Sequence, residues 1–590
     1  MKRTPSLLQG IVVSALLFSS LPAGAQTFNT AFGTGAFASN TTGSNNSAFG
    51  YLSLNANTAG NNNSAFGKYS LASNTIGEYN SAFGVNSLQN NTTGGFNSAV
   101  GFQSLYSNTT GSNNTATGAF SLYTNSTGSN NSAFGYASLF PNTTGSNNSA
   151  FGYNSLASNT TGNNNTAIGF SALSSNSTGN NNSAVGNEAL LSNTTGIQNS
   201  ANGSYALRSN STGNYNTGTG FRALSSNSTG NNNSAVGNEA LLSNTTGSNN
   251  VANGYQALSS NNIGNNNTAV GNEALLSNTT GIQNSANGSY ALRSCTNGYE
   301  NVANGFQALK SNTTGYQNSA NGSNALFSIV TGKQNTANGS QALYKSTSAG
   351  YCTADGYQAL YNARGNWNLG LGYRAGYNIT TGTNNIAISN LGNATDTGVI
   401  RIGTTGTHTA TLIAGINGAT ATGGVAVYID ANGQLGTVTS SRRFKNEIKS
   451  MGNISDKLLK LRPVTFRYKS SDSKGGHPLQ YGLIAEEVAK VFPDLVQYDK
   501  QGKPFTIYYH LLTPMILNEL QKEHGSRKAE VTALKSEVAS LKSTLAKHSA
   551  ENATMKAELA QQKRLLSQLA AYVQSTKPNA PIQKVNIVQH

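Results

Sequence analysis

The feature that most restricts the fold of this chain is a 17-residue period. A glycine recurs every 17 residues from Gly33 to Gly356, and after the loss of one residue Gly372 and Ser389 continue the series, giving about 22 repeats. In nearly every repeat, Ala lies two positions before this glycine, Leu lies four positions after it and a second Gly follows ten positions after it. Such invariant spacing is the signature of stacked structural repeats.

The apolar residues of one repeat are too few to form a core alone. Stacked coils would align the single Leu and the single Ala into columns, so that each coil covers the next. Only 36% of the 590 residues are hydrophobic and only 10% are charged, against about 25% charged in an ordinary soluble domain. This composition argues against one large globular enzyme, and the scarcity of charge and proline also argues against disorder.

Local propensities favour β-structure in the array. Gly and Asn suit tight corners, Thr and Phe suit short strands, and Asn at a fixed position of each coil suits side-chain ladders between coils. We therefore predict a mainly β chain whose residues 26–389 form a parallel β-solenoid, one coil per repeat. A helical solenoid needs longer periods and better helix formers, and low-complexity disorder does not require invariant spacing.

The recurring spelling Asn-Ser-Ala-Phe-Gly, seen at residues 46–50, resembles the head repeats of trimeric autotransporter adhesins. The resemblance covers residues 27–389, although the adhesin repeat is usually shorter than 17 residues. It implies a trimeric left-handed β-roll and adhesion to a glycan or a cell surface.

The array lacks the residues that catalysis or metal binding requires. Between residues 26 and 389 there are no His, one Asp (Asp355) and five Glu. Glycosidases need paired carboxylates, and calcium-binding solenoids need an Asp in each repeat. We expect no cofactor and no metal. Aromatic residues such as Tyr51, Phe102 and Tyr255 could stack on sugars, but packing or a trimer interface is the favoured interpretation.

The formal net charge of +15 is unevenly distributed. The repeats contribute +3, whereas the residues beyond 389 contribute +10. Nucleic-acid binding favours basic residues clustered on one face with aromatic residues between them. The basic residues beyond 389 alternate with acidic ones on predicted helices, which indicates a solvated helical surface and no nucleic-acid partner.

The N-terminus predicts export. Met1-Lys2-Arg3 precedes an apolar stretch, and Ala23-Gly24-Ala25 forms an A-x-A cleavage site, so residues 1–25 read as a Sec signal peptide. We expect a secreted or cell-surface bacterial protein with no membrane span after signal removal. An uncleaved anchor is the alternative. Cys295 and Cys352 are more than three repeats apart, too far for a disulfide in a stacked solenoid.

The pattern changes after residue 389. Residues 390–436 predict a β-rich neck, with strands at 399–403 and 425–429. Charge then increases at Ser440-Ser441-Arg442-Arg443-Phe444-Lys445. A helix is expected at about 454–461 and a strand at 464–469, followed by Tyr-Gly-Leu-Ile-Ala-Glu-Glu-Val at 481–488 and Phe-Pro-Asp-Leu-Val at 492–496.

This order of motifs over residues 437–525 resembles the endosialidase-type intramolecular chaperones, a self-cleaving serine-peptidase family at the C-termini of phage tail spikes and fibres. The resemblance implies a small α+β domain that trimerises, guides assembly of the preceding fibre and then releases itself. The family's Ser-x-x-Arg-x-Lys element maps onto Ser440, Arg443 and Lys445. By that resemblance Ser440 is the nucleophile and Lys445 the general base.

The sequence departs from the family pattern at two positions. Ser441 replaces the usual Asp after the nucleophile, and Tyr481 stands where many members have His; the nearest histidine is His477. A serine hydroxyl attacks only when a base removes its proton, and a lysine is such a base only when burial lowers its pKa. The enzymatic activity is therefore at most a single-turnover self-cleavage, and the alternative is a cap that stays attached.

Residues 526–576 predict a coiled coil, followed by a tail at 577–590. The heptad runs through Val531, Leu534, Val538, Leu541, Leu545, His548, Asn552, Met555, Leu559, Leu566, Leu569 and Val573. Polar His548 and Asn552 lie in this seam, where Asn tends to select register and oligomeric state.

Together these features predict a secreted homotrimeric fibre or adhesin-like surface protein whose C-terminal chaperone domain drives trimerisation and cuts next to Ser440. The alternatives are a glycan- or ice-binding repeat protein with a non-cleaving trimerisation cap, and a prophage tail-fibre component.

Overall fold

The computed structural model describes residues 28–416, 418–430, 432–470, 475–499 and 501–576. The predicted signal peptide (1–25) and tail (577–590) lie outside the described residues. The chain divides into two compact units, with the boundary after Leu412.

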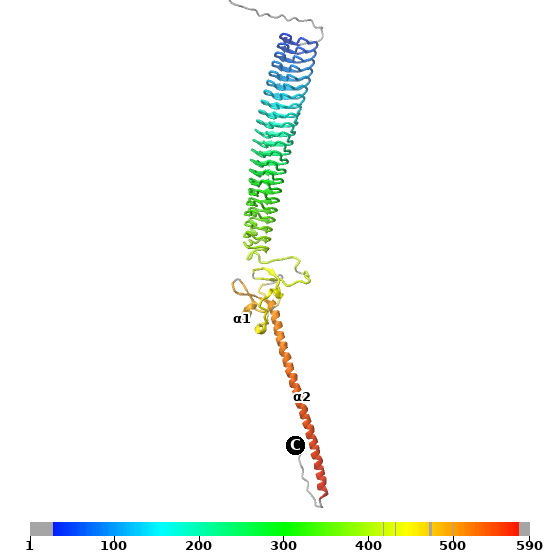
Figure 1. Ribbon diagram of the computed structural model, residues 1–590, viewed down its shortest axis with the longest axis vertical. Coiled ribbons are helices and arrows are strands. Elements are labelled where there is room, and N and C mark those ends of the chain that lie inside the picture. The colour runs from blue at the N-terminus through cyan, green and yellow to red at the C-terminus, as the bar shows by residue number, and fades with distance from the viewer. Residues whose placement is uncertain (1–27, 417, 431, 471–474, 500, 577–590) are drawn as a thin grey trace, which may run out of the picture. The chain divides into compact units, whose positions relative to one another are not determined.

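The first unit is a parallel solenoid with one short strand in each coil (Figure 1). Each strand pairs in parallel with the strand of the next coil at equivalent positions, so that Ala48 lies opposite Ala65 and Phe49 opposite Phe66. The predicted mainly β solenoid of about 22 coils is confirmed. The strands are β1 (Thr30–Phe32), β2 (Ser47–Phe49), β3 (Ser64–Phe66), β4 (Ser81–Phe83), β5 (Ser98–Val100), β6 (Thr115–Thr117), β7 (Ser132–Phe134), β8 (Ser149–Phe151), β9 (Thr166–Ile168), β10 (Ser183–Val185), β11 (Ser200–Asn202), β12 (Thr217–Thr219), β13 (Ser234–Val236), β14 (Val251–Asn253), β15 (Thr268–Val270), β16 (Ser285–Asn287), β17 (Val302–Asn304), β18 (Ser319–Asn321), β19 (Thr336–Asn338), β20 (Thr353–Asp355), β21 (Leu369–Leu371), β22 (Ile386–Ile388) and β23 (Ile400–Ile402).

The core of the solenoid consists of the two columns that the repeat predicts. The central Ala of most strands, such as Ala48, and the Leu four positions after most repeat glycines, such as Leu54, are fully buried. The flanking strand residues face outward, because successive side chains of a strand point to opposite faces. One thin core is thus repeated along the whole array.

The corners contain backbone that the sequence did not reveal. The buried Leu adopts a left-handed conformation, with φ of 49° at Leu54 and 53° at Leu173. This conformation costs a non-glycine residue about 1–3 kcal/mol. The complete burial of the same side chain offsets that cost, which explains why Leu rather than Gly or Asn occupies this corner.

The repeat glycine is required by close contact between coils. Gly152 has φ of 138°, and a Cβ there would lie 2.4 Å from the carbonyl oxygen of Gly169 in the next coil. No other residue type fits this approach, which accounts for the strict glycine period.

Two columns of buried Asn connect the coils, as the sequence predicts. In the strand ladder, which runs every 17 residues from Asn46 to Asn335, the backbone N–H of Asn63 donates to Oδ1 of Asn46 (2.9 Å). In the turn ladder, from Asn57 to Asn278, Nδ2 of each Asn donates to Oδ1 of its neighbour, as Asn227 does to Asn210 (2.7 Å). Buried polar groups must be paired, and these ladders pair them.

Both cysteines occupy ladder positions. Cys295 takes the next position of the turn ladder, and Cys352 takes the next position of the strand ladder; both are buried free thiols. Burial raises the pKa of Cys295 to about 12 and that of Cys352 to about 11. The turn ladder also loses Asn to Ile329, and Oδ1 of Asn278 and of Asn312 are buried without a hydrogen-bond partner among the described residues.

The solenoid continues one strand beyond the last 17-residue repeat. Strand β23, which was expected in the neck, pairs in parallel with β22. Arg401 in β23 donates from Nε and Nη2 to the two carboxylate oxygens of Asp396, at 2.6 and 2.8 Å. This bidentate pair lowers the pKa of Asp396, chiefly through the hydrogen bond from Arg401.

The second unit contains short elements and one long helix. The elements are the hairpin β24 (Tyr428–Ile429) and β25 (Leu435–Gly436), the 3-10 helices η1 (Arg442–Phe444), η2 (Gly452–Lys460) and η3 (Pro493–Leu495), the strand pairs β26 (Val464–Phe466) with β27 (Gln480–Gly482) and β28 (Val496–Tyr498) with β29 (Pro504–Ile507), and the helices α1 (Ala485–Val491) and α2 (Tyr509–Ser575).

The second unit has a small core of its own. Val488, Phe492, Leu495, Val496 and Ile507 are buried together. The helix expected at 454–461 is the 3-10 helix η2, shifted by about two residues. Helix α2 is continuous from the predicted chaperone region into the predicted coiled-coil region (Figure 1).

Candidate functional site

The two predicted catalytic residues lie at either end of the short helix η1. Ser440 lies just before Ser441, the residue that precedes this helix, and Lys445 directly follows the helix. The backbone N–H of Phe444 donates to the carbonyl of Ser441, and that of Lys445 to the carbonyl of Arg442. The turn brings the two side chains together, and Nζ of Lys445 donates to Oγ of Ser440 at 3.1 Å. A nucleophile and a base need this distance for proton transfer.

Both side chains of this pair are exposed in the single chain. A lysine accepts a proton from serine only when its amine is neutral, and burial favours the neutral amine. The hydroxyl of Ser440 and the amine of Lys445 are therefore within hydrogen-bond distance, and the described residues of the single chain do not shield them from solvent.

The neighbouring motif residues take other positions. The guanidinium of Arg443 lies 4.6 Å from the ring centre of Phe444. Tyr481 in β27 is 78% exposed and lies opposite Thr465 of β26. His477 has Nδ1 at 2.9 Å from the carbonyl of Tyr468. Among the described residues, neither Tyr481 nor His477 forms a hydrogen bond with Ser440 or Lys445.

A polar cluster between η2 and α2 was not anticipated from the sequence. Ser455 is fully buried, and its hydroxyl donates to Oε1 of Glu519 at 2.5 Å while accepting from Nδ2 of Asn518 at 2.5 Å. Lys522 pairs with both Glu519 (2.7 Å) and Asp456. The i, i+3 spacing of Glu519 and Lys522 on a helix is the sequence signal that could have indicated the ion pair within this cluster. The cluster fixes η2 onto the start of α2.

A second such contact explains a motif glycine. The hydroxyl of Tyr509 accepts a hydrogen bond from the backbone N–H of Leu483 at 3.0 Å. A Cβ on Gly482 would lie 2.7 Å from this hydroxyl. The Tyr-Gly-Leu-Ile-Ala motif thus holds the first residue of α2 against β27.

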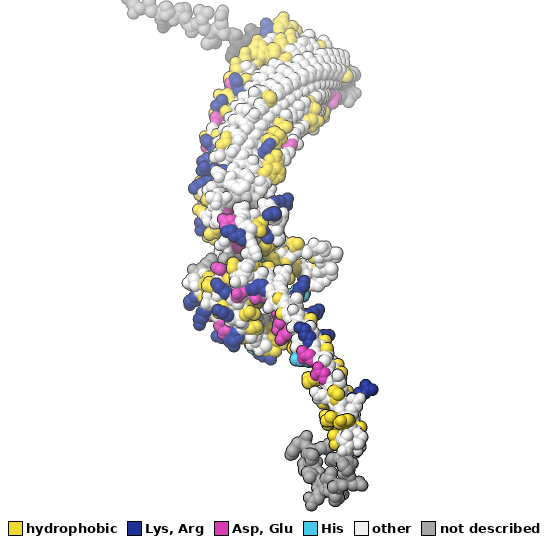
Figure 2. Space-filling view, turned by 60° about the horizontal axis from the view of Figure 1, so that its bottom comes forward, with side chains coloured by type: hydrophobic (Ala, Val, Ile, Leu, Met, Phe, Trp, Pro, Cys, Tyr) yellow, Lys and Arg dark blue, Asp and Glu magenta, His cyan; other side chains and the backbone are white. Residues whose placement is uncertain are grey.

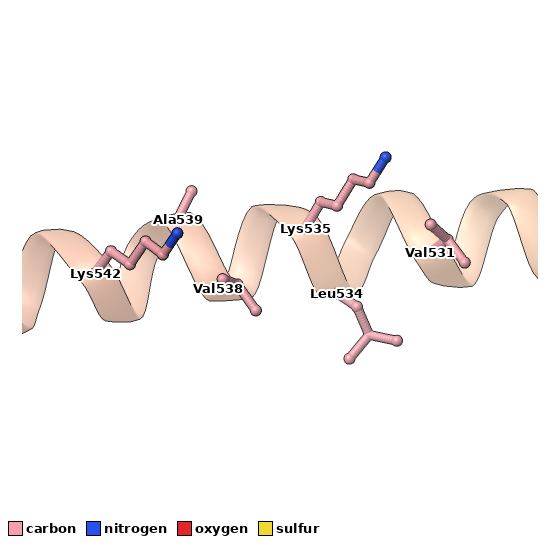
Figure 3. Close-up of a pocket in the computed structure, with 6 residues that line it drawn as sticks. All are labelled: Val531, Leu534, Lys535, Val538, Ala539 and Lys542. Atoms are coloured by element: carbon pink, nitrogen blue, oxygen red, sulfur yellow. The ribbon is translucent and has the colours of Figure 1, made fainter.

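Helix α2 carries an apolar seam that the described residues of the chain leave uncovered. None of its residues is buried, and its heptad positions, such as Leu534 (51%), Leu541 (61%) and Leu545 (70%), are exposed. Figure 3 shows Leu534 and Val538 pointing to one side of the helix and Lys535 and Ala539 to the other. A shallow groove along this part of the helix is lined by the side chains of Val531, Leu534, Lys535, Val538, Ala539 and Lys542. His548 in the seam lies 3.0 Å from Glu551.

Many aromatic residues of the solenoid stack on a ring of the next coil, whereas Tyr51 and Phe102 contact Tyr69 and Phe120 edge to face. Tyr136 stacks on Tyr153 and Tyr153 on Phe170, each with ring centres 5.4 Å apart. Sugar stacking needs a free ring face, and within these columns the faces lie against the neighbouring coil. The packing interpretation of the aromatic columns is the better one.

In the part of the chain that the structure describes, there is no cluster of three or more His, Cys, Asp or Glu side chains placed to hold a metal ion. In the same residues, no helix has the length and apolar character needed to cross a membrane.

Comparison with known proteins identifies one family. Residues 440–497 match the family model described as the chaperone of endosialidase. No curated protein and no solved structure matches the chain significantly. The match begins at Ser440 and ends within β28, so it contains the Ser440–Lys445 pair and most of the small core. Within the C-terminal unit, residues 440–497 thus match the chaperone-of-endosialidase family, and this matching segment follows a long parallel β-solenoid of repeats.

Proposed function

We propose that this protein is a secreted, homotrimeric fibre or adhesin-like surface protein, similar in build to a phage tail fibre. In this proposal the solenoid is the exposed shaft or head, and the C-terminal domain is an intramolecular chaperone that brings three chains together. The match of residues 440–497 to the chaperone family, directly behind a repeat solenoid, is the observation that carries it.

The surface of α2 supports self-association. A heptad seam with leucines 51–70% exposed is expected to pack against the same seam of other copies, because a/d positions exclude water when helices supercoil. Asn552 lies in this seam, and a polar residue at such a position selects one register and one oligomeric state at some cost in stability.

The outer face of the solenoid supports the same interpretation. The residue before the repeat glycine faces outward and is apolar in the N-terminal coils, as at Phe83 (42% exposed) and Phe151 (38%). From Asn287 it is Asn in four successive coils. A long apolar strip on a sheet is unusual on a monomer and marks a contact surface.

Self-cleavage next to Ser440 is the second part of the proposal. The hydrogen bond between Lys445 and Ser440 supplies the geometry, and association of three domains would supply the burial that a neutral lysine requires. Cleavage would then report correct assembly. The chemistry is amide hydrolysis: the Ser440 oxygen attacks a peptide carbonyl, its proton passes to Lys445 and then to the leaving amine, and water releases the acyl group.

The test is expression of the full-length protein with Ser440→Ala, Lys445→Met and Ser441→Ala, followed by intact and native mass spectrometry. We expect wild type and Ser441→Ala to yield a C-terminal fragment beginning at about residue 440, and the other two variants to stay intact. Ser441 is the matched control because it is the adjacent hydroxyl without a bond to Lys445.

The two parts of the proposal fail separately. An intact wild-type chain that is trimeric in native mass spectrometry contradicts self-cleavage and favours a cap that stays attached, which the Ser441 and Tyr481 departures would explain. A monomeric chain contradicts the fibre itself. Cleavage of the Ser440→Ala variant would assign the cut to another protease.

A further inference from the structure

The charged residues of the solenoid are divided between two regions. Residues 26–300 contain four Lys/Arg and five Glu, whereas residues 301–389 contain five Lys/Arg and one Asp. In the face of the molecule that Figure 2 shows, the basic side chains gather toward the C-terminal coils. The last coils of the solenoid therefore carry a net positive charge that the earlier coils lack.

The basic residues of the two regions also have different partners. Arg208, Arg222 and Arg293 each form an ion pair with a Glu, at 2.6, 3.3 and 2.6 Å. Among the described residues, Lys310, Lys345 and Arg374 form no ion pair with a carboxylate. No described carboxylate therefore neutralises their charge.

These three cations lie along one continuous stack of rings. Phe327, Tyr344, Tyr361 and Tyr377 stack in successive coils with ring centres 5.0, 5.1 and 5.2 Å apart. Because each cation contacts this single stack, all three face the same side of the solenoid. The three cations and the four rings are called the basic stripe below.

The contacts with the rings orient the three cations. Nζ of Lys310 lies 5.3 Å from the ring centre of Phe327, and Nζ of Lys345 lies 5.3 Å from that of Tyr361. The guanidinium of Arg374 lies 4.0 Å from the ring centre of Tyr377. A cation over a ring face is held in place without losing its charge.

The three cations are spread along several coils of the solenoid. Lys310 follows strand β17, Lys345 follows β19 and Arg374 follows β21. The amines of Lys310 and Lys345 contact the ring of the following coil, whereas Arg374 contacts the ring of its own coil. A row of positive charges along one side of the solenoid complements a linear polymer that carries negative charges along its length.

We propose that the basic stripe binds an acidic linear polysaccharide, with Lys310, Lys345 and Arg374 contacting its carboxylate or sulfate groups. The proposal rests on the proposed extracellular fibre for its choice of polymer. A single-stranded nucleic acid is disfavoured because its bases need free aromatic faces, and the rings of the stripe stack on one another. Recognition is then by charge, with the ring stack as a rigid support.

The same array offers a natural counterpart. Tyr106, Tyr123 and Phe140 occupy the equivalent column in earlier coils and stack at 5.1 and 5.1 Å, with no Lys or Arg over their rings among the described residues. Positions 107 and 124, which are Ser and Thr, stand at the phase that Lys345 occupies in its coil.

The test uses the full-length protein and immobilised polygalacturonate, with a neutral glucan and a single-stranded oligonucleotide as comparison ligands. We expect binding to polygalacturonate that weakens as salt is added, and little binding to the neutral glucan. The variant Lys310→Gln/Lys345→Gln/Arg374→Gln should bind about tenfold more weakly or worse, since exposed charge contacts contribute a factor of about two to five each.

Two further variants make the test independent of folding. Lys68→Gln/Arg208→Gln/Arg222→Gln removes the same charge elsewhere and should keep the affinity within about twofold. Ser107→Lys/Thr124→Lys, added to the triple stripe variant, should restore part of the binding by placing cations beside the uncharged stack.

Each remaining outcome overturns the proposal. Equal loss in the stripe and control triples would mean that only net charge matters, and preferred binding of the oligonucleotide would replace the polysaccharide with a nucleic acid. No binding by a chain that native mass spectrometry shows to be trimeric would reject the stripe while leaving the proposed fibre intact.

Discussion

The two units of this molecule bury their apolar side chains in opposite ways. In the solenoid, Leu and Ala of almost every coil are fully buried by the coils before and after. In the C-terminal unit, five apolar residues form the buried core, and helix α2 buries none of its 67 residues. The apolar side chains of each solenoid coil are covered by other coils of the same chain. The C-terminal unit instead exposes the apolar surface by which chains would meet in the proposed trimer.

In the proposed function, this difference would let one chain combine a fibre with its own assembly device. A solenoid gains stability from each added coil, because each coil covers the apolar residues of the next. The heptad seam of α2 would gain stability only from another copy. Assembly and folding would then depend on separate parts of the sequence, and substitutions should separate them.

The largest effect is expected from charge in the seam. Leu541→Asp/Leu545→Asp places two carboxylates where apolar side chains should meet, and we expect loss of the trimer with the far-ultraviolet spectrum of the solenoid retained. Native mass spectrometry and circular dichroism measure the two results. Ser543→Asp/Ala550→Asp lies off the seam and should stay trimeric; a trimeric seam variant would show that α2 does not hold the chains together.

The next effect is a cavity in the solenoid core. Leu190 is fully buried and its neighbour Leu191 is only partly buried. Leu190→Ala should destabilise its coil by about 2–5 kcal/mol, and Leu191→Ala should cost much less. Hydrogen exchange of the coils around residue 190 is the measurement. Equal protection in the two variants would contradict a core made of single columns.

A smaller effect is expected at the C-terminal end of the solenoid. Asp396 is stabilised as a carboxylate by Arg401, and its pKa is lowered. The pair should therefore contribute its full stability above the ordinary carboxyl pKa of about 4, and lose it as the pH falls through the lowered folded value. Since the Arg401 side chain is 36% exposed, we expect only about 1–2 kcal/mol.

Thermal unfolding of wild type and Asp396→Asn at pH 7 and at pH 3 measures this contribution. The variant should be less stable at pH 7 and should approach wild type at the lower pH. A constant difference across this range would mean that packing, and not the ion pair, makes Asp396 important.

Much of the solenoid could be predicted because each repeat position has a single role. The 17-residue period predicted one coil per repeat, the recurring Ala and Leu predicted the core columns, and the recurring Asn predicted the ladders. The left-handed conformation of Leu54 and its equivalents was not predicted, because Leu has no local preference for it and adopts it only when the neighbouring coils bury it. Strand β23 was predicted to lie outside the array because its spacing from the last repeat is irregular. Only its pairing with β22 makes it part of the solenoid.

The candidate site was predictable only in part. The pairing of Ser440 with Lys445 was predicted from the family resemblance and not from their spacing alone, and the structure places a hydrogen bond between them. The Ser455–Glu519 bond joins residues 64 positions apart, and no local pattern signals such a contact. The burial that a reactive lysine needs is likewise absent from local sequence, because it depends on the neighbours that a chain acquires on assembly.

The smallest expected effect concerns the break in the turn ladder, where a substitution should raise the stability of the solenoid and not lower it. Cys295→Asn should restore two hydrogen bonds, one from its Nδ2 to the unpaired Oδ1 of Asn278 and one from Nδ2 of Asn312 to its own Oδ1, as at Asn227 between Asn210 and Asn244. The neighbouring coils should then gain about 1 kcal/mol. The control Cys295→Ser removes the thiol but is too short to reach either neighbour.

Hydrogen exchange of the coils around residues 278–312 measures this gain in both variants. Slower exchange in Cys295→Asn than in Cys295→Ser would show that these coils are less stable because their ladder is interrupted. Equal exchange would mean that the coils are held by their Leu and Ala columns alone. In that case the ladders would select the register of the stack without adding to its stability. The early and late coils would then be similar in stability although the late coils have fewer ladder hydrogen bonds.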